Sequence, residues 1–118
     1  WPQFDLVLLG MGADGHTASL FPGSSPESNK PTMAVTAQYQ GRPANRVTLT
    51  SGVFNHAELI LFLVTGAEKK KALSTVLEGK YDPVHWPAQR IQPSNGEVMW
   101  LVDSEAAYWD GDQDGVVV

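Results

Sequence analysis

The sequence predicts an α/β fold in which helices pack on a mostly parallel β-sheet. Two short apolar runs, at residues 4–9 and 58–64, are typical of strands that are buried on both faces of such a sheet. A third strand-like segment, at residues 97–102, follows a stretch with helical spacing of apolar side chains at residues 68–77. Because strands alternate with helices along the chain, a layered α/β domain is expected.

The first half of the chain is expected to contain short elements separated by glycine- and proline-rich turns. Residues 46–50 alternate and are rich in β-branched side chains, so they favour a strand more strongly than residues 33–37 do. In order, the elements are a strand ending at Gly10, a short helix at residues 17–21, a proline- and serine-rich loop at 22–31, strands at 33–37 and 46–50, and a short helix at 51–57 with Ser51 as its cap.

The second half adds an amphipathic helix at residues 68–77, for which Gly79 is a natural stop. A loop at residues 80–95 is expected to contain one short extended piece near Arg90 and Ile91. After the strand at 97–102, we expect a short helix at 104–109, capped by Asp103 or Ser104. Residues 1–109 then form the folded region, and residues 110–118 form an acidic tail.

Composition excludes several classes of function. The 118 residues correspond to one domain or part of one, and the net charge of −5 argues against a nucleic-acid partner or an anionic membrane surface. The lack of cysteine excludes a disulfide framework, a thiolate zinc site and a cysteine nucleophile, and it fits a reducing, cytoplasmic location. The longest apolar run is far shorter than the ~20 residues of a membrane span.

The glycine-rich loop after the first strand is the candidate active site. Gly10, Gly12 and Gly15 let the backbone turn sharply and approach a ligand closely, and His16 follows them directly. In open α/β sheets, ligands bind outside the carboxyl ends of the strands, where this loop lies. Histidine suits proton transfer near neutral pH, and Asp14 is placed to orient the imidazole or to hold a substrate hydroxyl.

The same loop admits two other interpretations. The glycine spacing is not G-x-G-x-x-G, and no acidic residue ends a second strand ~20 residues later, which argues against a nicotinamide dinucleotide. In the purely structural interpretation, His16 fills the loop and bonds to the backbone.

Residues 4–22 (FDLVLLGMGADGHTASLFP) resemble the signature segment of 6-phosphogluconolactonases. Residues 46–50, 65–69, 87–89 and 100–103 also resemble segments of that family, so the similarity covers about residues 4–107. The G-x-D-G-H core is shared with glucosamine-6-phosphate deaminases, whereas residues 17–22 favour the lactonase.

The resemblance implies a Rossmann-like three-layer α/β sandwich that needs no metal and no cofactor. It implies hydrolysis of 6-phospho-D-glucono-1,5-lactone to 6-phospho-D-gluconate, a step of the oxidative pentose phosphate pathway. The motif histidine of the family is the proposed general base and falls on His16. Backbone N–H groups of the turn from Gly12 to Gly15 are candidates for stabilising the oxyanion formed when water attacks the lactone.

The substrate phosphate requires a cation, and Lys69 is the candidate. It lies in the first turn of the expected helix, on the stripe that faces the sheet, where a cation opposes the helix dipole. The G-x-x-K pattern of the family also ends on Lys69. The alternative is a solvated lysine run at residues 69–71. Arg46 is a second candidate, either as a bidentate phosphate ligand or as a structural partner of a carboxylate.

The family is roughly twice as long as this chain, and its N-terminal half has no counterpart here. We therefore expect a C-terminal portion of a larger domain, whose first strand pairs with sequence not present. The isolated chain is expected to be weakly active or inactive. Alternative functions are a sugar-phosphate isomerase or deaminase of the same fold, and a non-catalytic interaction or calcium-binding module whose EF-hand-like loop would begin at Asp110.

Overall fold

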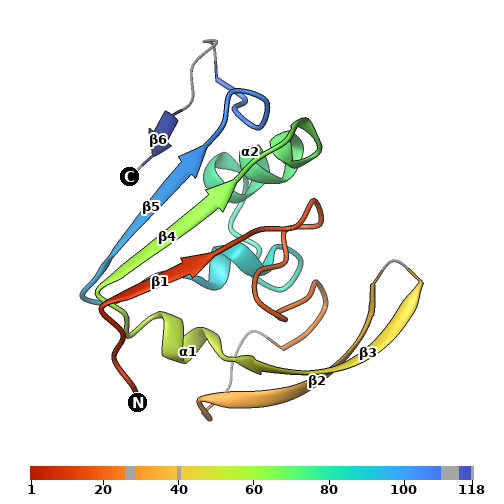
Figure 1. Ribbon diagram of the computed structural model, residues 1–118, viewed down its shortest axis with the longest axis vertical. Helices are drawn as coiled ribbons and strands as arrows, with labels where there is room; N and C mark the ends of the chain where they lie inside the picture. The colour runs from red at the N-terminus through yellow and green to blue at the C-terminus, as the bar shows by residue number, and fades with distance from the viewer. Residues whose placement is uncertain (26–28, 40, 110–114, 118) are drawn as a thin grey trace.

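A four-stranded sheet forms the centre of the computed structural model, which describes residues 1–25, 29–39, 41–109 and 115–117 (Figure 1). Its strand order is β1-β4-β5-β6, with β1, β4 and β5 parallel and β6 antiparallel to β5. The predicted α/β class with a mostly parallel sheet is therefore confirmed. The strands are β1 (Leu6–Leu9), β4 (Leu59–Val64), β5 (Glu97–Val102) and β6 (Gly115–Val117).

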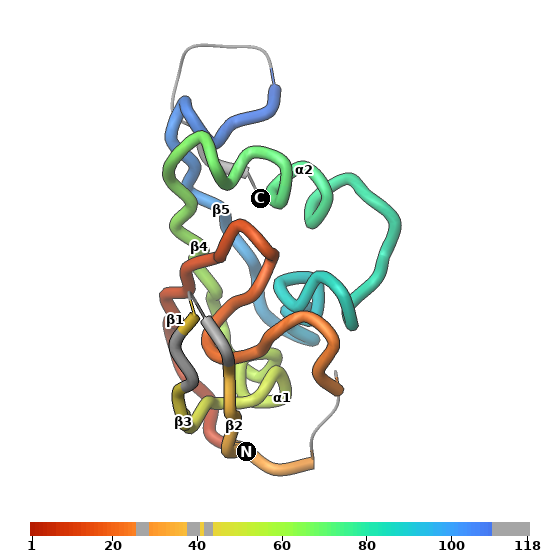
Figure 2. Tube along the Cα trace, turned by 90° about the vertical axis from the view of Figure 1, so that its right-hand side faces the viewer, coloured from red at the N-terminus to blue at the C-terminus, as the bar shows by residue number. Residues whose placement is uncertain are grey.

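One face of this sheet carries the hydrophobic core. Strand register aligns Leu9 with Phe62, and Phe62 with Trp100, so that side chains of the same face lie side by side. The rings of Phe62 and Trp100 stack with their centroids 3.9 Å apart. Helices α2 (Lys70–Glu78) and η2 (Pro87–Arg90) cover this face, on one side of the sheet in Figure 2.

No element of the described ranges covers the opposite face of the sheet. Leu6 and Leu8 of β1 are 50% and 58% exposed, and Leu63 of β4 is 47% exposed. The expectation that both apolar runs are buried on two faces is therefore wrong for this chain. Strand β1 also lies at the sheet edge and pairs only with β4 in the described part, which is the unpaired edge that the sequence predicts.

The predicted strands at 33–37 and 46–50 form a separate antiparallel hairpin of β2 (Thr32–Tyr39) and β3 (Arg42–Leu49). It leads directly into α1 (Ser51–Phe54), which is shorter than expected. Thr50, not Ser51, occupies the cap position of α1, and its hydroxyl donates to the Lys30 carbonyl oxygen at 2.7 Å.

Three other local expectations are wrong. Residues 17–21 form a tight turn instead of a helix, because the Leu20 N–H donates back to the Thr17 carbonyl at 2.9 Å. Where an extended piece is expected near Arg90 and Ile91, the 3-10 helix η2 runs through Arg90, and of the two only Ile91 has extended backbone angles. Residues 104–109 form no helix: residues 104–106 make a single turn, and the Asp103 carboxylate accepts the Ala106 N–H as a cap would.

The predicted helix at 68–77 is observed as a 3-10 turn, η1 (Ala67–Lys69), that continues into α2 and ends at Gly79. At the other end of the chain, residues 115–117 form β6, whereas residues 110–114 lie outside the described residues. The predicted acidic tail and the start of the calcium-binding loop fall largely on that segment. No helix in the described ranges is long and apolar enough to cross a membrane.

Candidate active site

The glycine loop directly follows β1, at the carboxyl end of the parallel strands (Figure 1). Hydrogen bonds within the loop fix its shape: the Gly12 N–H donates to the His16 carbonyl at 2.9 Å, and the Gly15 N–H donates to the Gly12 carbonyl at 2.9 Å. The buried Thr17 hydroxyl donates to the Gly10 carbonyl at 2.8 Å. The loop therefore presents His16 from a preformed backbone.

Asp14 and His16 form a close pair in this loop. The Nδ1 atom of His16 lies 2.5 Å from Asp14 Oδ1, and the same oxygen accepts the His16 backbone N–H at 3.0 Å. A carboxylate acceptor at Nδ1 favours the tautomer with its proton on Nδ1, which leaves the basic lone pair on Nε2. The His16 side chain is 17% exposed. Nε2 is therefore the ring nitrogen that can accept a proton.

The charge of Asp14 is stabilised by its neighbour. Partial burial acts to raise the pKa of Asp14, but hydrogen bonds from the His16 backbone and side chain, with the attraction of the imidazolium, lower it below the usual value. Asp14 consequently stays ionised well below neutral pH and keeps the imidazole oriented.

The two glycines beside this pair provide space. A Cβ atom on Gly12 would lie 2.2 Å from His16 Nδ1, and one on Gly15 would lie 2.6 Å from the Trp86 ring. Gly15 also has a φ of 83°, which favours glycine. Because both N–H groups are already donated inside the loop, the structure does not favour them as oxyanion donors. A role of Gly12 and Gly15 in substrate binding stays a prediction.

Lys69 shares a pocket with His16, as the sequence predicts. The pocket has a volume of about 330 Å³. The Lys69 ammonium donates to the Met11 carbonyl at 2.5 Å, which anchors the side chain against the glycine loop. An ammonium has three N–H groups. Among the described residues, Lys69 donates one of them, to Met11, so two remain to bind an anion. The lining residues are Gly10, Met11, Gly12, His16, Thr17, Ala18 and Lys69.

Phe21 connects Arg46 to the pair, which the sequence alone did not indicate. Its ring centroid lies 5.0 Å from that of His16, and the Arg46 guanidinium lies 5.8 Å from the Phe21 centroid. This spacing is that of a cation–π contact. A second hollow of about 450 Å³ lies on this side, between Asp14, Phe21 and the β2–β3 hairpin. The structure thus brings Arg46 close to the site, whereas its phosphate role stays a prediction.

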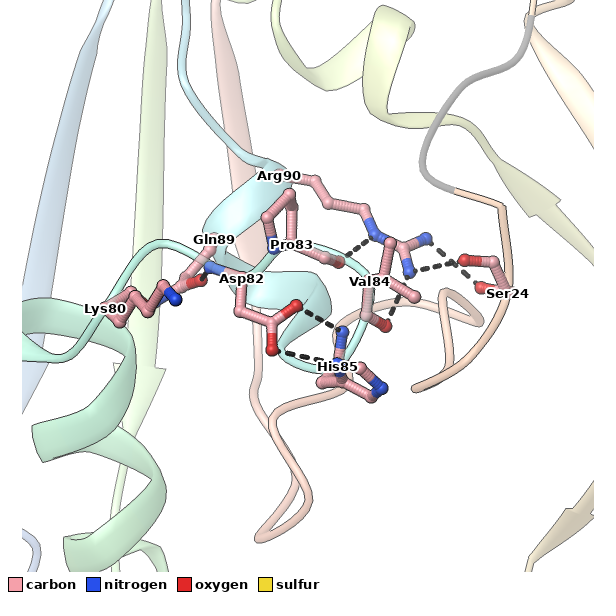
Figure 3. A network of polar contacts seen from close by, with 8 residues as sticks. All are labelled: Ser24, Lys80, Asp82, Pro83, Val84, His85, Gln89 and Arg90. Atoms are coloured by element: carbon pink, nitrogen blue, oxygen red, sulfur yellow. Dashed lines mark hydrogen bonds and ion pairs between the residues drawn. The ribbon is translucent and has the colours of Figure 1, made fainter.

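A buried arginine supports the loop that follows Phe21. Arg90 is 5% exposed, and burial lowers the pKa of its guanidinium. Its Nε donates to the Pro83 carbonyl at 2.6 Å, and its terminal nitrogens donate to Ser24 Oγ, the Ser24 carbonyl and the Val84 carbonyl (Figure 3). Arg90 therefore ties the segment after Phe21 to the loop before η2.

The other described histidines and two of the tryptophans make structural contacts. His56 Nδ1 lies 2.7 Å from the Gly52 carbonyl, and His85 pairs with Asp82 on an exposed loop. Trp86 and Trp100 pack against Gly15 and Phe62, respectively. Within the described ranges, no three histidine, aspartate or glutamate side chains are grouped to hold a metal ion.

Comparison with known proteins gives the family. A sequence profile described as glucosamine-6-phosphate isomerases/6-phosphogluconolactonase matches residues 1–100. A curated 6-phosphogluconolactonase from Synechocystis is 42% identical over 106 residues, which are 90% of this chain and 43% of that protein. The chain therefore spans less than half the length of this relative.

Solved structures agree with this assignment. The 6-phosphogluconolactonase of Trypanosoma brucei is 34% identical with a TM-score of 0.76, over 89% of this chain and 41% of that one. A monomeric glucosamine-6-phosphate deaminase is 29% identical with a TM-score of 0.74, over 86% of this chain and 46% of that one. The chain belongs to the glucosamine-6-phosphate isomerase/6-phosphogluconolactonase family.

Proposed function

We propose that the protein containing this chain hydrolyses 6-phospho-D-glucono-1,5-lactone to 6-phospho-D-gluconate, as a carboxylic ester hydrolase of the oxidative pentose phosphate pathway. The observation that carries the proposal is that His16, which is paired with Asp14, lines the same pocket as Lys69. A base for water and a cation for a distant phosphate are the two groups that this reaction requires. Relatives named 6-phosphogluconolactonase support the same substrate.

In the proposed reaction, His16 acts as a general base. Its Nε2 takes a proton from water as the water oxygen bonds to C1 of the lactone, and the carbonyl electrons move to the carbonyl oxygen. The resulting tetrahedral intermediate collapses with cleavage of the bond between C1 and the ring oxygen. The protonated imidazole returns the proton to that oxygen, giving an open-chain hydroxy acid. No covalent enzyme intermediate is required.

Each ionic side chain has a separate part in this proposal. Asp14 holds the imidazole through Nδ1 and stabilises its protonated form after the first proton transfer. Lys69 binds the phosphate with the N–H groups that Met11 does not occupy. Arg46, stacked over Phe21, is the second phosphate ligand.

The uncovered sheet face belongs to the same proposal. Leu6, Leu8 and Leu63 present an exposed apolar surface, and relatives are about twice as long as this chain. We propose that the N-terminal half of the domain covers this face and supplies the third layer. The location proposed for the complete protein is cytoplasmic, which cell fractionation tests.

The test is lactone opening by the full-length polypeptide, measured as acid release above the spontaneous rate. His16→Ala is compared with His85→Ala, whose imidazole is 70% exposed and also pairs with an aspartate. Loss of catalysis in the first variant only is expected. Full activity of His16→Ala rejects His16 as the base.

A deaminase of the same fold is the second candidate, because a glucosamine-6-phosphate deaminase is structurally similar. Both substrates are offered to the wild-type protein under identical conditions. Ammonia release from glucosamine 6-phosphate without lactone hydrolysis would favour the deaminase.

A further inference from the structure

Asp103 bridges the ends of two neighbouring strands beside the pocket. The register pairs Val64 with Val102, so Asp103 at the end of β5 lies next to the turn that follows β4. Its Oδ1 and Oδ2 atoms are 3.1 and 3.2 Å from the backbone nitrogen of Gly66, and Oδ1 also accepts the Ala106 N–H at 2.9 Å. The carboxylate therefore holds the Gly66 peptide with a charge-assisted hydrogen bond.

Gly66 sets the direction of the segment that carries Lys69. Its φ of 99° and ψ of 146° turn the chain out of β4, and its carbonyl accepts the Lys69 N–H at 3.1 Å. A Cβ at this position would lie 2.6 Å from a carboxylate oxygen of Glu68. The Glu68 carboxylate ends a flexible side chain and can move, so it is the positive φ that makes this turn favour glycine. The orientation of the turn determines where the Lys69 side chain begins.

We propose that Asp103 is a positioning residue for Lys69. Its carboxylate fixes the Gly66 peptide, the peptide fixes η1, and η1 directs the Lys69 ammonium across the pocket to Met11. Substrate readouts of this inference rest on the proposed function, because they use Lys69 as the phosphate ligand. The positioning itself is measurable without any reaction.

The kinetic test uses Asp103→Ala, Asp103→Asn, Lys69→Ala and the double variant Asp103→Ala/Lys69→Ala in the full-length protein. Asp103→Ala should raise KM for the lactone about tenfold and change kcat by less than about threefold. Asparagine keeps one acceptor oxygen, so Asp103→Asn should raise KM only about threefold. The double variant should be no worse than Lys69→Ala alone, because the two residues act as a unit.

Glu105→Ala is the matched control, because Glu105 is an exposed carboxylate two residues from Asp103. It should leave KM and kcat unchanged. Additive losses in the double variant, or a fall in kcat at constant KM in Asp103→Ala, would overturn the proposal. If Asp103→Ala does not fold, Asp103→Asn with Lys69→Ala completes the same cycle.

A second readout separates this inference from the proposed function. Amide hydrogen exchange of Gly66, followed by NMR, should become about tenfold faster or more in Asp103→Ala and stay unchanged in Glu105→Ala. If the wild-type protein does not hydrolyse the lactone, the proposed function fails, and the exchange rate alone decides the positioning role. Unchanged exchange of Gly66 in Asp103→Ala rejects it.

Discussion

The described part of the chain contains two aspartate–histidine pairs that differ in their surroundings. His16 Nδ1 lies 2.5 Å from Asp14, and His85 Nδ1 lies 2.8 Å from Asp82. The histidine of the first pair is 17% exposed, whereas that of the second is 70% exposed. Hydrogen-bond geometry alone therefore does not distinguish a candidate general base from a surface contact.

The environments make the distinction. His16 packs so closely on Gly12 that a Cβ there would have no room. The His16 ring also lies against the Phe21 ring, and His16 shares a pocket with Lys69. His85 lies on the loop before η2, where its side chain is largely in solvent. A substrate held between a base and a phosphate ligand requires the first environment. The pocket, more than the aspartate–histidine pair, therefore marks the candidate site.

The largest expected effect comes from removing the two histidines in turn. His16→Ala should lower kcat for lactone hydrolysis about 10³-fold, because it removes the general base. His85→Ala should change kcat less than about twofold, since surface substitutions away from a site are nearly neutral. Comparable losses in the two variants would mean that the pocket confers no special role on His16.

Replacing the aspartate of each pair should also have different effects on kcat. Asp14→Asn should lower kcat about 10²-fold, because an amide disfavours the tautomer with the lone pair on Nε2 and does not stabilise the imidazolium. Asp82→Asn is the control and should leave kcat unaltered. Steady-state kinetics at neutral pH measure both. A fully active Asp14→Asn variant contradicts the orienting role.

Lys69→Ala tests the cation that lines the same pocket as His16. We expect KM for the lactone to rise about tenfold with little change in kcat, because a phosphate far from C1 is bound similarly in the ground and transition states. Lys70→Ala is the control, because Lys70 is an exposed neighbour in the same lysine run. An unchanged KM in Lys69→Ala removes the phosphate role.

The smallest expected effect is on stability. Although burial acts to raise the pKa of Asp14, hydrogen bonds to His16 lower it, so the pair stabilises the fold above the usual aspartate pKa of 3.8. This stabilisation is lost as pH falls through the lower pKa of the folded state. Asp14→Asn should lower Tm at pH 7 by about 2 °C, and the difference should vanish in acid.

The side-chain hydrogen bond from His85 lowers the pKa of Asp82 in the same direction. Because this pair is exposed to solvent, Asp82→Asn should shift Tm less than Asp14→Asn. Thermal unfolding monitored by circular dichroism across the acid range compares the two variants. A larger change in Tm for Asp82→Asn than for Asp14→Asn would show that the exposed pair stabilises the fold more than the pair in the glycine loop does.

Local patterns in the sequence were sufficient to place the main strands and the two ends of the pocket. Parallel strands end at one edge of a sheet, so a glycine loop after β1 and a lysine after β4 were expected to meet, and the pocket contains both. The shared location of His16 and Lys69 is thus confirmed, whereas their catalytic and phosphate-binding roles stay predictions.

Features that depend on tertiary contacts have no signal in the local sequence. Arg90 donates to Ser24 across 66 positions of the chain, and no local pattern indicates that contact. The Thr17 hydroxyl donates to the Gly10 carbonyl beside the turn at residues 17–21, and the spacing of apolar residues does not indicate this contact either. Burial of the strands on both faces was predicted from apolarity alone, but burial also requires a covering layer, which the described chain provides on one face only.

A crystal structure of the full-length protein with 6-phospho-D-gluconate would show whether His16 and Lys69 bind the two ends of one ligand. We expect the product carboxylate within hydrogen-bond distance of His16 Nε2 and its phosphate on the Lys69 ammonium, in the pocket that Gly10, Gly12 and Thr17 also line. A product that occupies another surface, or that contacts neither His16 nor Lys69, would contradict the account.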